Sequence, residues 1–250
     1  MAGRKASRGV ASRDRWAAQI AALDGTPDAP TSRREPITVA RIVAAALQVV
    51  ETEGFDALTM RRVAAALPAS PGALYAHVRD KSELDDLMIG ELCSRVTLPA
   101  PDPARWQVQA IEVCAQLRDQ YLRYPEIWRA TLATTPNSLD TLRIAEGLLA
   151  IMQAGGVPLR PASWAIDSAL VYVGAYSVMA QRRLTDQDTD GQAIGQAEVI
   201  ERLEMLPPDR FPIMSTHARE LITSTGHDQF DFTLNLLFAG LPHTGAHHER

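Results

Sequence analysis

The sequence predicts an all-α protein, in which a small N-terminal helical unit precedes a larger helical domain. Apolar residues recur every three or four positions through most of the 250-residue chain, which is the spacing of one helix face. Proline and glycine mark most of the breaks between these stretches. Hydrophobic residues make up 46% of the chain, which is ample for helical cores.

The first helix is expected at residues 39–53. Thr38 stands before it as an N-cap, and Gly54 comes after it as a C-terminal stop. Its apolar face consists of Ile42, Val43, Ala46, Leu47 and Val50. This helix supports the pair of short helices expected next in the chain.

Residues 59–81, TMRRVAAALPASPGALYAHVRDK, predict two short helices joined by a tight turn. Thr59 is placed as the N-cap of the first helix, whose buried stripe is Met60, Val63, Ala64 and Leu67. Ser70 offers a second N-cap, and Pro71 then takes the first helical position, where its missing N–H costs nothing.

A fourth helix is expected to open at Asp80, because Glu83 three residues later completes a capping-box pattern. Its apolar stripe is Leu84, Leu87, Met88 and Leu92. Four helices over residues 37–97 make a small domain, whose core is expected to lean on the second domain.

The second short helix has the character of a DNA-reading element. Leu74 and Val78 face inward, which leaves small residues at its exposed start and hydrogen-bonding residues one turn later. A DNA major groove about 12 Å wide admits one helix, and the first residues of that helix approach the base edges. The predicted DNA-binding residues are Thr59, Arg61, Arg62, Ser70, Pro71, Gly72, Ala73, Tyr75, His77 and Lys81. For Tyr75 or His77 taken alone, an ordinary surface position on a helical hairpin stays open.

Residues 37–92, with ARIVAAALQVVETEGFDALTMRRVAAAL and SPGALYAHVRDKSELDDL, resemble the DNA-binding domain of the tetracycline-repressor (TetR) family of bacterial transcription regulators. Residues 209–241, DRFPIMSTHARELITSTGHDQFDFTLNLLFAGL, are similar to the C-terminal part of the tetracycline-repressor-like branch. The resemblance implies base contacts at residues 71–73 and phosphate contacts from Tyr75, His77 and Lys81. Pro68 stands where the family usually has glycine in the turn, so the path of this turn stays open.

Charge is unevenly distributed along the chain. Residues 1–81 hold 12 Lys and Arg against 8 Asp and Glu, whereas the rest holds 13 against 22. A basic unit on an acidic body predicts DNA binding that depends steeply on salt. Residues 1–36 form a basic arm, which either enters the minor groove or is a solvated tail. No segment suggests export or membrane spanning, so we expect a cytoplasmic protein.

The connector at residues 98–103 opens the second domain, expected to run to residue 241 before a tail at residues 242–250. Its helices are expected at about 104–124, 126–133, 138–154, 162–183, 213–225 and 228–239, with a short one ending at Pro207 and a loop over 185–196.

The helices at 162–183 and 228–239 are apolar around most of their circumference, so one face of each needs a cover. Pairing of two chains into a four-helix bundle supplies that cover and sets two DNA-reading helices one duplex turn apart. The predicted interface residues of this homodimer are Leu170, Val173, Phe230, Leu234, Leu237 and Phe238. A monomer with both helices central is the alternative.

The second domain is larger than dimerisation requires, which indicates a pocket for a small apolar or aromatic ligand. Its expected lining is Trp106, Leu117, Tyr121, Trp128, Met152, Trp164, Tyr172, Tyr176 and Met179, although core packing is an alternative for each one. Tetracycline-binding relatives use a histidine and an acid, and no histidine lies between Lys81 and Thr216, so tetracycline is not the expected ligand.

No cofactor or metal site is expected. Cys93 and Cys114 have neither the spacing of a zinc site nor that of a disulfide framework and are expected to be buried thiols. His217 and Glu220 share a helix face without a third ligand.

The predicted function is that of a homodimeric repressor that binds a palindromic operator and is released by a small molecule. An architectural DNA-binding protein that responds to no ligand is the first alternative. An enzyme is the second, against which stands the lack of any nucleophile, metal or phosphate-binding motif.

Overall fold

The computed structural model describes Ile20 and residues 37–67, 69–124, 126–130, 138–188, 195–222 and 227–241. Two compact units are distinguished, Met1–Thr38 and Val39–Arg250, and helices α2 to α13 lie in the second. The predicted basic arm at residues 1–36 (apart from Ile20), Pro68 in the predicted turn and the tail after residue 241 fall outside the described residues. In the described ranges every regular element is a helix, which confirms the all-α prediction.

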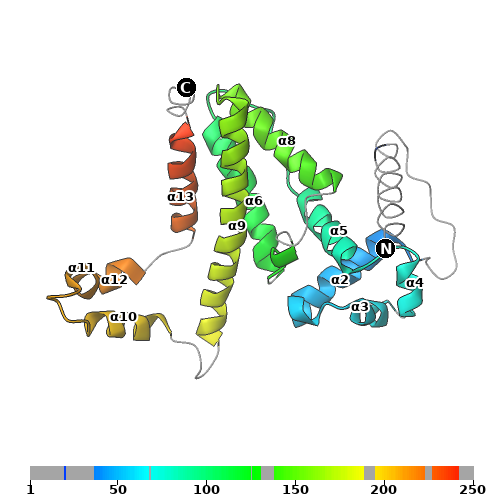
Figure 1. Ribbon diagram of the computed structural model, residues 1–250, viewed down its shortest axis with the longest axis horizontal. Helices are drawn as coiled ribbons and strands as arrows, with labels where there is room; N and C mark the ends of the chain where they lie inside the picture. Colours follow the sequence, from blue (N-terminus) through cyan, green and yellow to red (C-terminus); the bar gives the residue numbers. More distant parts are fainter. Residues whose placement is uncertain are drawn as a thin grey trace, which may run out of the picture. The chain divides into compact units, whose positions relative to one another are not determined.

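The head, our name for residues 37–97, contains four α-helices and one 3-10 turn (Figure 1). They are α2 (Val39–Glu53), η1 (Phe55–Ala57), α3 (Met60–Ala66), α4 (Pro71–Tyr75) and α5 (Lys81–Ser94). All four predicted helices are confirmed. Gly54 has φ 84°, a left-handed conformation that glycine adopts without strain, and it ends α2 as expected.

Side-chain caps fix where these helices begin. Thr59 Oγ1 accepts a hydrogen bond from the backbone N–H of Arg62 (3.1 Å), and Asp80 Oδ1 accepts one from Glu83 N (3.0 Å). The predicted capping box closes differently: the Glu83 carboxylate accepts from Arg79 N (2.6 Å), one residue before the cap.

The core of the head comes from one face of each helix. Its fully buried members include Ile42, Ala46 and Val50 of α2, Val63 of α3, Leu74 and Val78 at and after α4, and Leu84, Met88 and Leu92 of α5. Helix α2 contacts both α3 and α5, so it connects the helix pair α3 and α4 to α5.

The body, our name for residues 98–241, is built around α6 (Trp106–Arg123), α8 (Leu139–Ala154), α9 (Leu159–Asp188) and α13 (Asp228–Ala239). Helices α6, α8 and α9 pack on one another, and α13 packs on α6 and α9 (Figure 1). Helix α5 also packs on α8, where Arg143 Nη2 donates to the carbonyl oxygens of Cys93 (2.7 Å) and Val96 (2.9 Å). One arginine therefore binds carbonyl groups at the C-terminal end of α5.

Helix α9 is longer than predicted at both ends. It starts at Leu159 rather than residue 162, because Pro161 falls in the first turn, where backbone N–H groups have no partner within the helix. It continues to Asp188, so the predicted loop over 185–196 is helical in its first four residues. Residues 185–188 are all polar, so the sequence predicted a loop there instead of the end of a helix.

The helix predicted at 126–133 begins later than expected. Residues 126–128 form turns, and Glu126 has φ 59°, outside the helical region. Residues 129 and 130 are helical, and 131–137 fall outside the described residues.

Residues 195–222 form three short helices that pack on one another: α10 (Gln196–Glu204), α11 (Pro212–Thr216) and α12 (Ala218–Ile222). The prediction of a single helix at 213–225 is wrong, because the helix is interrupted at His217, which has φ −108° and ψ 20°. Arg219 Nε lies 2.9 Å from Glu204 Oε1 and links α12 to α10.

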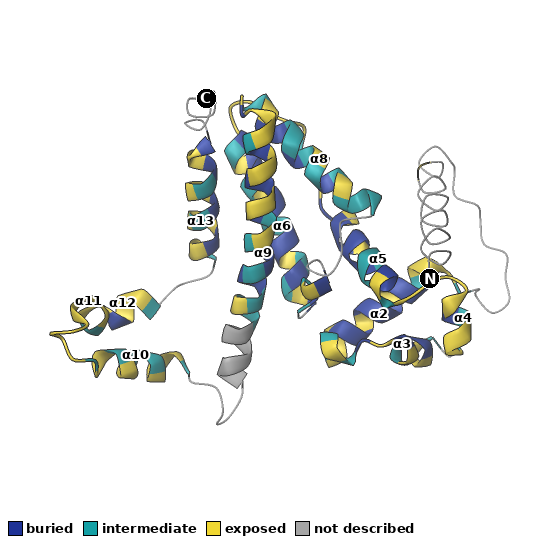
Figure 2. Cartoon of the chain, in the orientation of Figure 1, coloured by how far each residue is buried: buried dark blue, intermediate teal, exposed yellow. Residues whose placement is uncertain are grey.

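Glycines let the body helices approach large side chains closely. A Cβ on Gly155 would lie 2.2 Å from the Trp106 ring, and one on Gly174 would lie 2.8 Å from the Trp128 ring. In Figure 2 buried residues lie on α6, where it faces α9, and the outward face of α9 is largely exposed or intermediate. None of the helices in the described ranges is both long and apolar enough to cross a membrane.

Candidate nucleic-acid interface and ligand-binding body

Helix α4 is fixed by a cap at its start and by two anchors in the core. Ser70 Oγ accepts a hydrogen bond from Ala73 N (3.3 Å), and Pro71 takes the first helical position. Leu74 and Val78 are fully buried, which orients the helix. The other face is turned outward: Pro71, Gly72, Tyr75, Ala76 and His77 are exposed, and Ala73 is half-buried.

The fold does not require glycine at position 72. A Cβ built there would meet no atom of another residue nearer than Ser70 Oγ, at 3.9 Å. Its φ also lies outside the left-handed range. A small residue at the start of an exposed helix therefore suits close approach by a molecule outside the chain.

The two arginines predicted for DNA binding differ in their surroundings. Arg62 Nε donates to both oxygens of Glu53 (3.0 and 2.9 Å), and its Nη2 also pairs with Glu53, which ties α3 to the end of α2. This hydrogen bond, aided by the charge of Arg62, lowers the pKa of Glu53. Arg61 is exposed, and no ion pair holds it within the described residues.

Lys81 is also engaged inside the head. Its Nζ lies 2.8 Å from Oδ1 and 3.1 Å from Oδ2 of Asp85, and 4.4 Å from the centre of the Phe55 ring. Burial raises the pKa of Asp85 even though Lys81 opposes the shift. This pair was not predicted, although the i,i+4 spacing of Lys81 and Asp85 is a visible signal for it.

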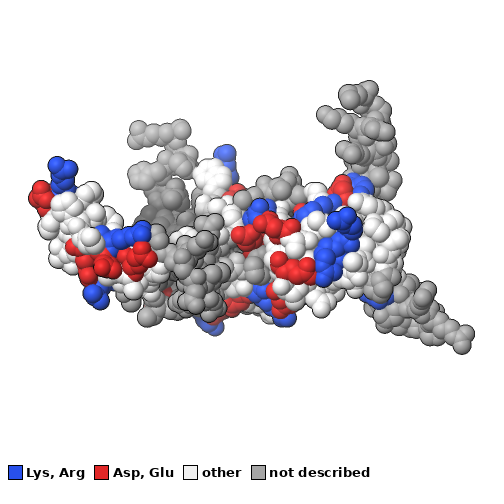
Figure 3. All heavy atoms as spheres, turned by 90° about the horizontal axis from the view of Figure 1, so that it is seen from below, with Lys and Arg blue, Asp and Glu red and all other residues white. Residues whose placement is uncertain are grey.

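Arg79, which lies between His77 and Lys81, was not predicted either. Its ion-pair distances are long, 3.7 Å to Glu83 and 3.9 Å to Asp80, and its side chain is half exposed. Seen from below, acidic and basic side chains alternate over the surface (Figure 3). On the head this agrees with the pairing of Arg62 and Lys81 with acids.

Most residues predicted to line a ligand pocket lie inside the body. Trp106, Leu117, Tyr121, Met152 and Tyr176 are buried, Trp128 and Tyr172 are half-buried, and Trp164 and Met179 are about half exposed. Trp164 also has Arg160 over its ring, at 5.5 Å. Trp164 and Met179 thus lie on the surface of α9 rather than with the interior group.

A cluster of rings joins α9 to the start of α13. Tyr172 stacks on Phe230 at 5.7 Å, and Tyr176 lies 5.0 Å from the same ring. Tyr176 Oη lies 2.9 Å from His227 Nδ1, and Tyr172 Oη donates to Gln229 O (3.1 Å). The cluster is thereby held by hydrogen bonds as well as by packing.

Arg118 of α6 borders this ring cluster and was not among the predicted residues. Its guanidinium lies 4.6 Å from the Phe230 ring and its side chain is 9% exposed. It is paired with its neighbour Asp119 (2.8 Å), whose own side chain is 60% exposed. Asp119 therefore compensates the charge of an arginine that is buried against an aromatic ring.

The predicted interface residues divide by burial. Val173, Phe230, Leu234 and Phe238 are buried within the chain's own core, and Leu170 and Leu237 are half-buried. The strongly exposed apolar side chains of these helices are Val171 (60%) on α9 and Phe232 (68%) and Leu236 (66%) on α13. The apolar surface available to a second chain is therefore centred on residues outside the predicted set.

The two cysteines are buried thiols, as expected, and burial raises the pKa of each to about 12. His217 Nδ1 lies 3.2 Å from Glu220 Oε2 on the surface. Within the described part of the chain, no group of three or more His, Cys, Asp or Glu is arranged to hold a metal ion.

Comparisons with known proteins agree with this geometry. Residues 42–85 match the model of bacterial regulatory proteins of the tetR family, and residues 98–244 match the tetracyclin repressor-like C-terminal domain. The chain is 27% identical to the HTH-type transcriptional repressor DrrR1 of Streptomyces coeruleorubidus, over 82% of this chain and 77% of that protein.

Two solved structures are similar over most of this chain. ActR of Streptomyces coelicolor, in complex with actinorhodin, has a TM-score of 0.76 and 29% identity over 86% of this chain and 99% of that one. BioQ, in complex with its double-stranded DNA operator, has a TM-score of 0.57 and 25% identity over 82% of this chain and 98% of that one.

Proposed function

Since the chain belongs to the TetR family of bacterial regulatory proteins, we propose that it is a ligand-responsive repressor that binds a palindromic operator as a homodimer. The observation that carries the proposal is α4: a helix capped by Ser70 and anchored by Leu74, with its other face exposed. Regulation of transcription in bacteria takes place at the chromosome, so the proposed compartment is the cytoplasm.

In the proposed complex α4 enters the major groove. Pro71, Gly72 and Ala73 approach base edges, and Tyr75 and His77 donate to phosphates. Arg61 and Arg79 join them as exposed cations near α4 in the sequence. Thr59 and Arg62 act through the fold instead, because one caps α3 and the other holds Glu53. Lys81 is paired with Asp85, but its side chain is 39% exposed and its ammonium has further N–H groups to donate to a phosphate.

The proposed dimer interface is the exposed apolar stripe of α9 and α13, centred on Val171, Phe232 and Leu236. Two copies of this stripe bury one another around a two-fold axis, as in a four-helix bundle. Leu170 and Leu237, which are half-buried in one chain, lie at the edge of this stripe.

The proposed ligand site lies in the body, among Tyr172, Tyr176 and Phe230, with Arg118 as the charged residue at its border. The solved complex of ActR with actinorhodin supports a small-molecule ligand for this chain and makes actinorhodin the first compound to test. Such a site suits a planar aromatic molecule, because rings supply the contact area and the guanidinium supplies one directed polar contact.

Release from DNA occurs if the ligand prefers a second arrangement of the two heads. A coupling of about 3 to 5 kcal/mol over both sites moves the operator from mostly bound to mostly free. Repression is the proposed outcome, since a bound dimer can block polymerase without further contacts.

The test is to select duplexes from a random-sequence pool with the full-length protein, and then to add actinorhodin to the selected complex. Enrichment of one inverted repeat, bound by two chains, supports the proposal. Equal retention of all sequences would instead identify an architectural DNA-binding protein. An enzyme has no support among these relatives.

A further inference from the structure

Residues 126–130 are anchored on the body side. The backbone N–H of Glu126 donates to Gln181 Oε1 of α9 (3.2 Å), and Gln181 Nε2 donates to the carbonyl oxygens of Tyr121 and Leu122 (both 3.1 Å). The Trp128 ring sits where a Cβ on Gly174 of α9 would collide with it. The turn after α6 is therefore fixed to α9 by a glutamine and by a ring.

The backbone of this turn needs that support. Glu126 has φ 59°, a left-handed conformation that side chains other than glycine rarely adopt. Such conformations persist when the surrounding structure holds them in place. Gln181 supplies a hydrogen bond at this residue.

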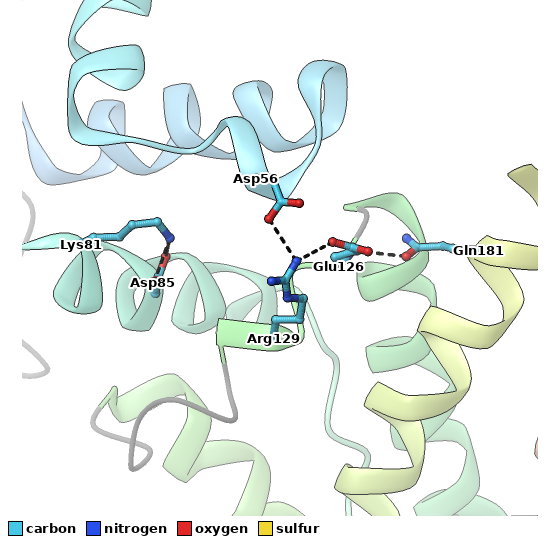
Figure 4. A network of polar contacts seen from close by, with 6 residues as sticks. All are labelled: Asp56, Lys81, Asp85, Glu126, Arg129 and Gln181. Atoms are coloured by element: carbon cyan, nitrogen blue, oxygen red, sulfur yellow. Dashed lines mark hydrogen bonds and ion pairs between the residues drawn. The ribbon is translucent and has the colours of Figure 1, made fainter.

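The same turn reaches the head through one side chain. Arg129 Nη1 lies 3.1 Å from Asp56 Oδ1 of η1 and 2.7 Å from Glu126 Oε2 (Figure 4). The Arg129 guanidinium also lies 5.7 Å from the centre of the Phe55 ring. Lys81 Nζ lies over the same ring at 4.4 Å. One aromatic side chain thus contacts a cation of the body and a cation at the start of α5.

We propose that Arg129 is a positioning residue, which transmits the position of α9 and of the turn at 126–130 to η1 and, through Phe55, to Lys81. The inference rests on the proposed function, because its consequence is a change in DNA binding. η1 connects α2 to Thr59, the N-cap of α3, so a shift of η1 displaces the start of the helix pair that carries α4.

A lone surface ion pair contributes little. Arg129 differs because its guanidinium binds two carboxylates and faces an aromatic ring, and because its backbone belongs to a turn held by α9. A second contact, Arg123 Nε to Glu51 Oε1 (3.0 Å), joins the end of α6 to the end of α2 nearby.

The test compares R129Q, D56N and the double variant of the full-length protein in binding to the selected operator. Plain electrostatics predicts opposite effects, because D56N removes a negative charge and R129Q a positive one. The positioning role predicts that both weaken binding by about threefold and that the double variant is no weaker than either. It also predicts an unchanged salt slope in D56N.

Tighter binding by D56N, or additive effects in the double variant, overturns the proposal. R105Q and E112Q are the matched controls, because Arg105 and Glu112 form an exposed pair (3.6 Å) within the body alone. Both controls should bind as the wild type does.

A second measurement does not depend on an operator. Amide hydrogen exchange in residues 55–67 should be faster in R129Q than in R105Q, and equal rates contradict the proposal. If the wild-type protein selects no operator, the proposed function fails, and the exchange rates still decide whether Arg129 restrains η1.

Discussion

Ser70 Oγ accepts a hydrogen bond from the backbone N–H of Ala73, at 3.3 Å, and so caps the helix proposed to enter DNA. Helix α4 has only five residues, too few to be stable alone. Its geometry therefore depends on this cap and on the burial of Leu74 and Val78.

The variant S70A should destabilise the protein by about 1 kcal/mol, which is the usual effect of losing an N-cap, and should weaken binding to every duplex. S70D should restore most of the stability, because aspartate also caps. Urea unfolding measures the effect. S82A is the control, since Ser82 is exposed on α5 and caps no helix. Equal stability of S70A and S82A would contradict the role of the cap.

Glycines 54 and 72 should respond oppositely to alanine. G54A should destabilise the fold by about 1 kcal/mol, because the φ of 84° disfavours any residue with a Cβ. G72A adds a methyl group at ordinary contact distance from Ser70 Oγ (3.9 Å) and should fold as stably as the wild type, yet change which duplexes are selected. Thermal unfolding and duplex selection measure the two effects. Unchanged selection by G72A would remove position 72 from the proposed base contacts.

The hydroxyl of Tyr75 should contribute to binding without regard to sequence. Y75F keeps the ring, which is 52% exposed, and loses the group proposed to donate to phosphate. We expect a loss of about 1 kcal/mol on operator and random duplexes alike. R79Q should also weaken binding to both kinds of duplex, and because it removes a charge it should lower the slope of log K against log salt concentration by about 1. Titrations at several salt concentrations give both values, and wild-type values for both variants would refute these contacts.

The exposed stripe of α13 should hold two chains together. L236E places a carboxylate at the centre of the proposed interface and should raise the dimer dissociation constant at least about tenfold. V108E is the control, because Val108 is an exposed residue of α6, 48% accessible, outside the stripe. Sedimentation at several concentrations distinguishes them. A dimer that L236E leaves intact would place the interface elsewhere.

Cys93 and Cys114 should be unreactive in the folded protein. Burial raises the pKa of both thiols to about 12, so very little of either is thiolate at pH 8. We expect labelling by a disulfide reagent to be slow in buffer and fast in urea. Rapid labelling of either thiol without denaturant would show that the body opens locally.

Several elements could be predicted from the sequence because the signals are local. Apolar spacing, Ser70 before Pro71, and Gly54 after α2 determine the helices of the head, and the structure confirms them. The break at His217 and the extension of α9 through residue 188 were not predicted, because no proline or glycine marks the break and residues 185–188 are polar.

The partners of charged side chains were harder to predict. Arg62 and Lys81 carry the positive charge expected of phosphate-binding residues, but in the structure they form ion pairs with Glu53 and Asp85. Arg129 meets Asp56 across 73 positions of sequence, and no pattern in a single chain indicates such a pair. Which apolar residues of α13 are buried could not be predicted either, because apolar residues occur on most of its faces. Phe230 is buried in the core, whereas Phe232 is exposed to solvent.

The central claim is that two copies of α4 read neighbouring major grooves of one duplex. Hydroxyl-radical footprinting of the selected duplex tests it most directly. The account predicts two symmetric patches of protection, centred about 10 base pairs apart or a multiple of that distance, both weakened in S70A at a concentration that just saturates the wild type. Uniform protection along the duplex, or a single patch without symmetry, would contradict it.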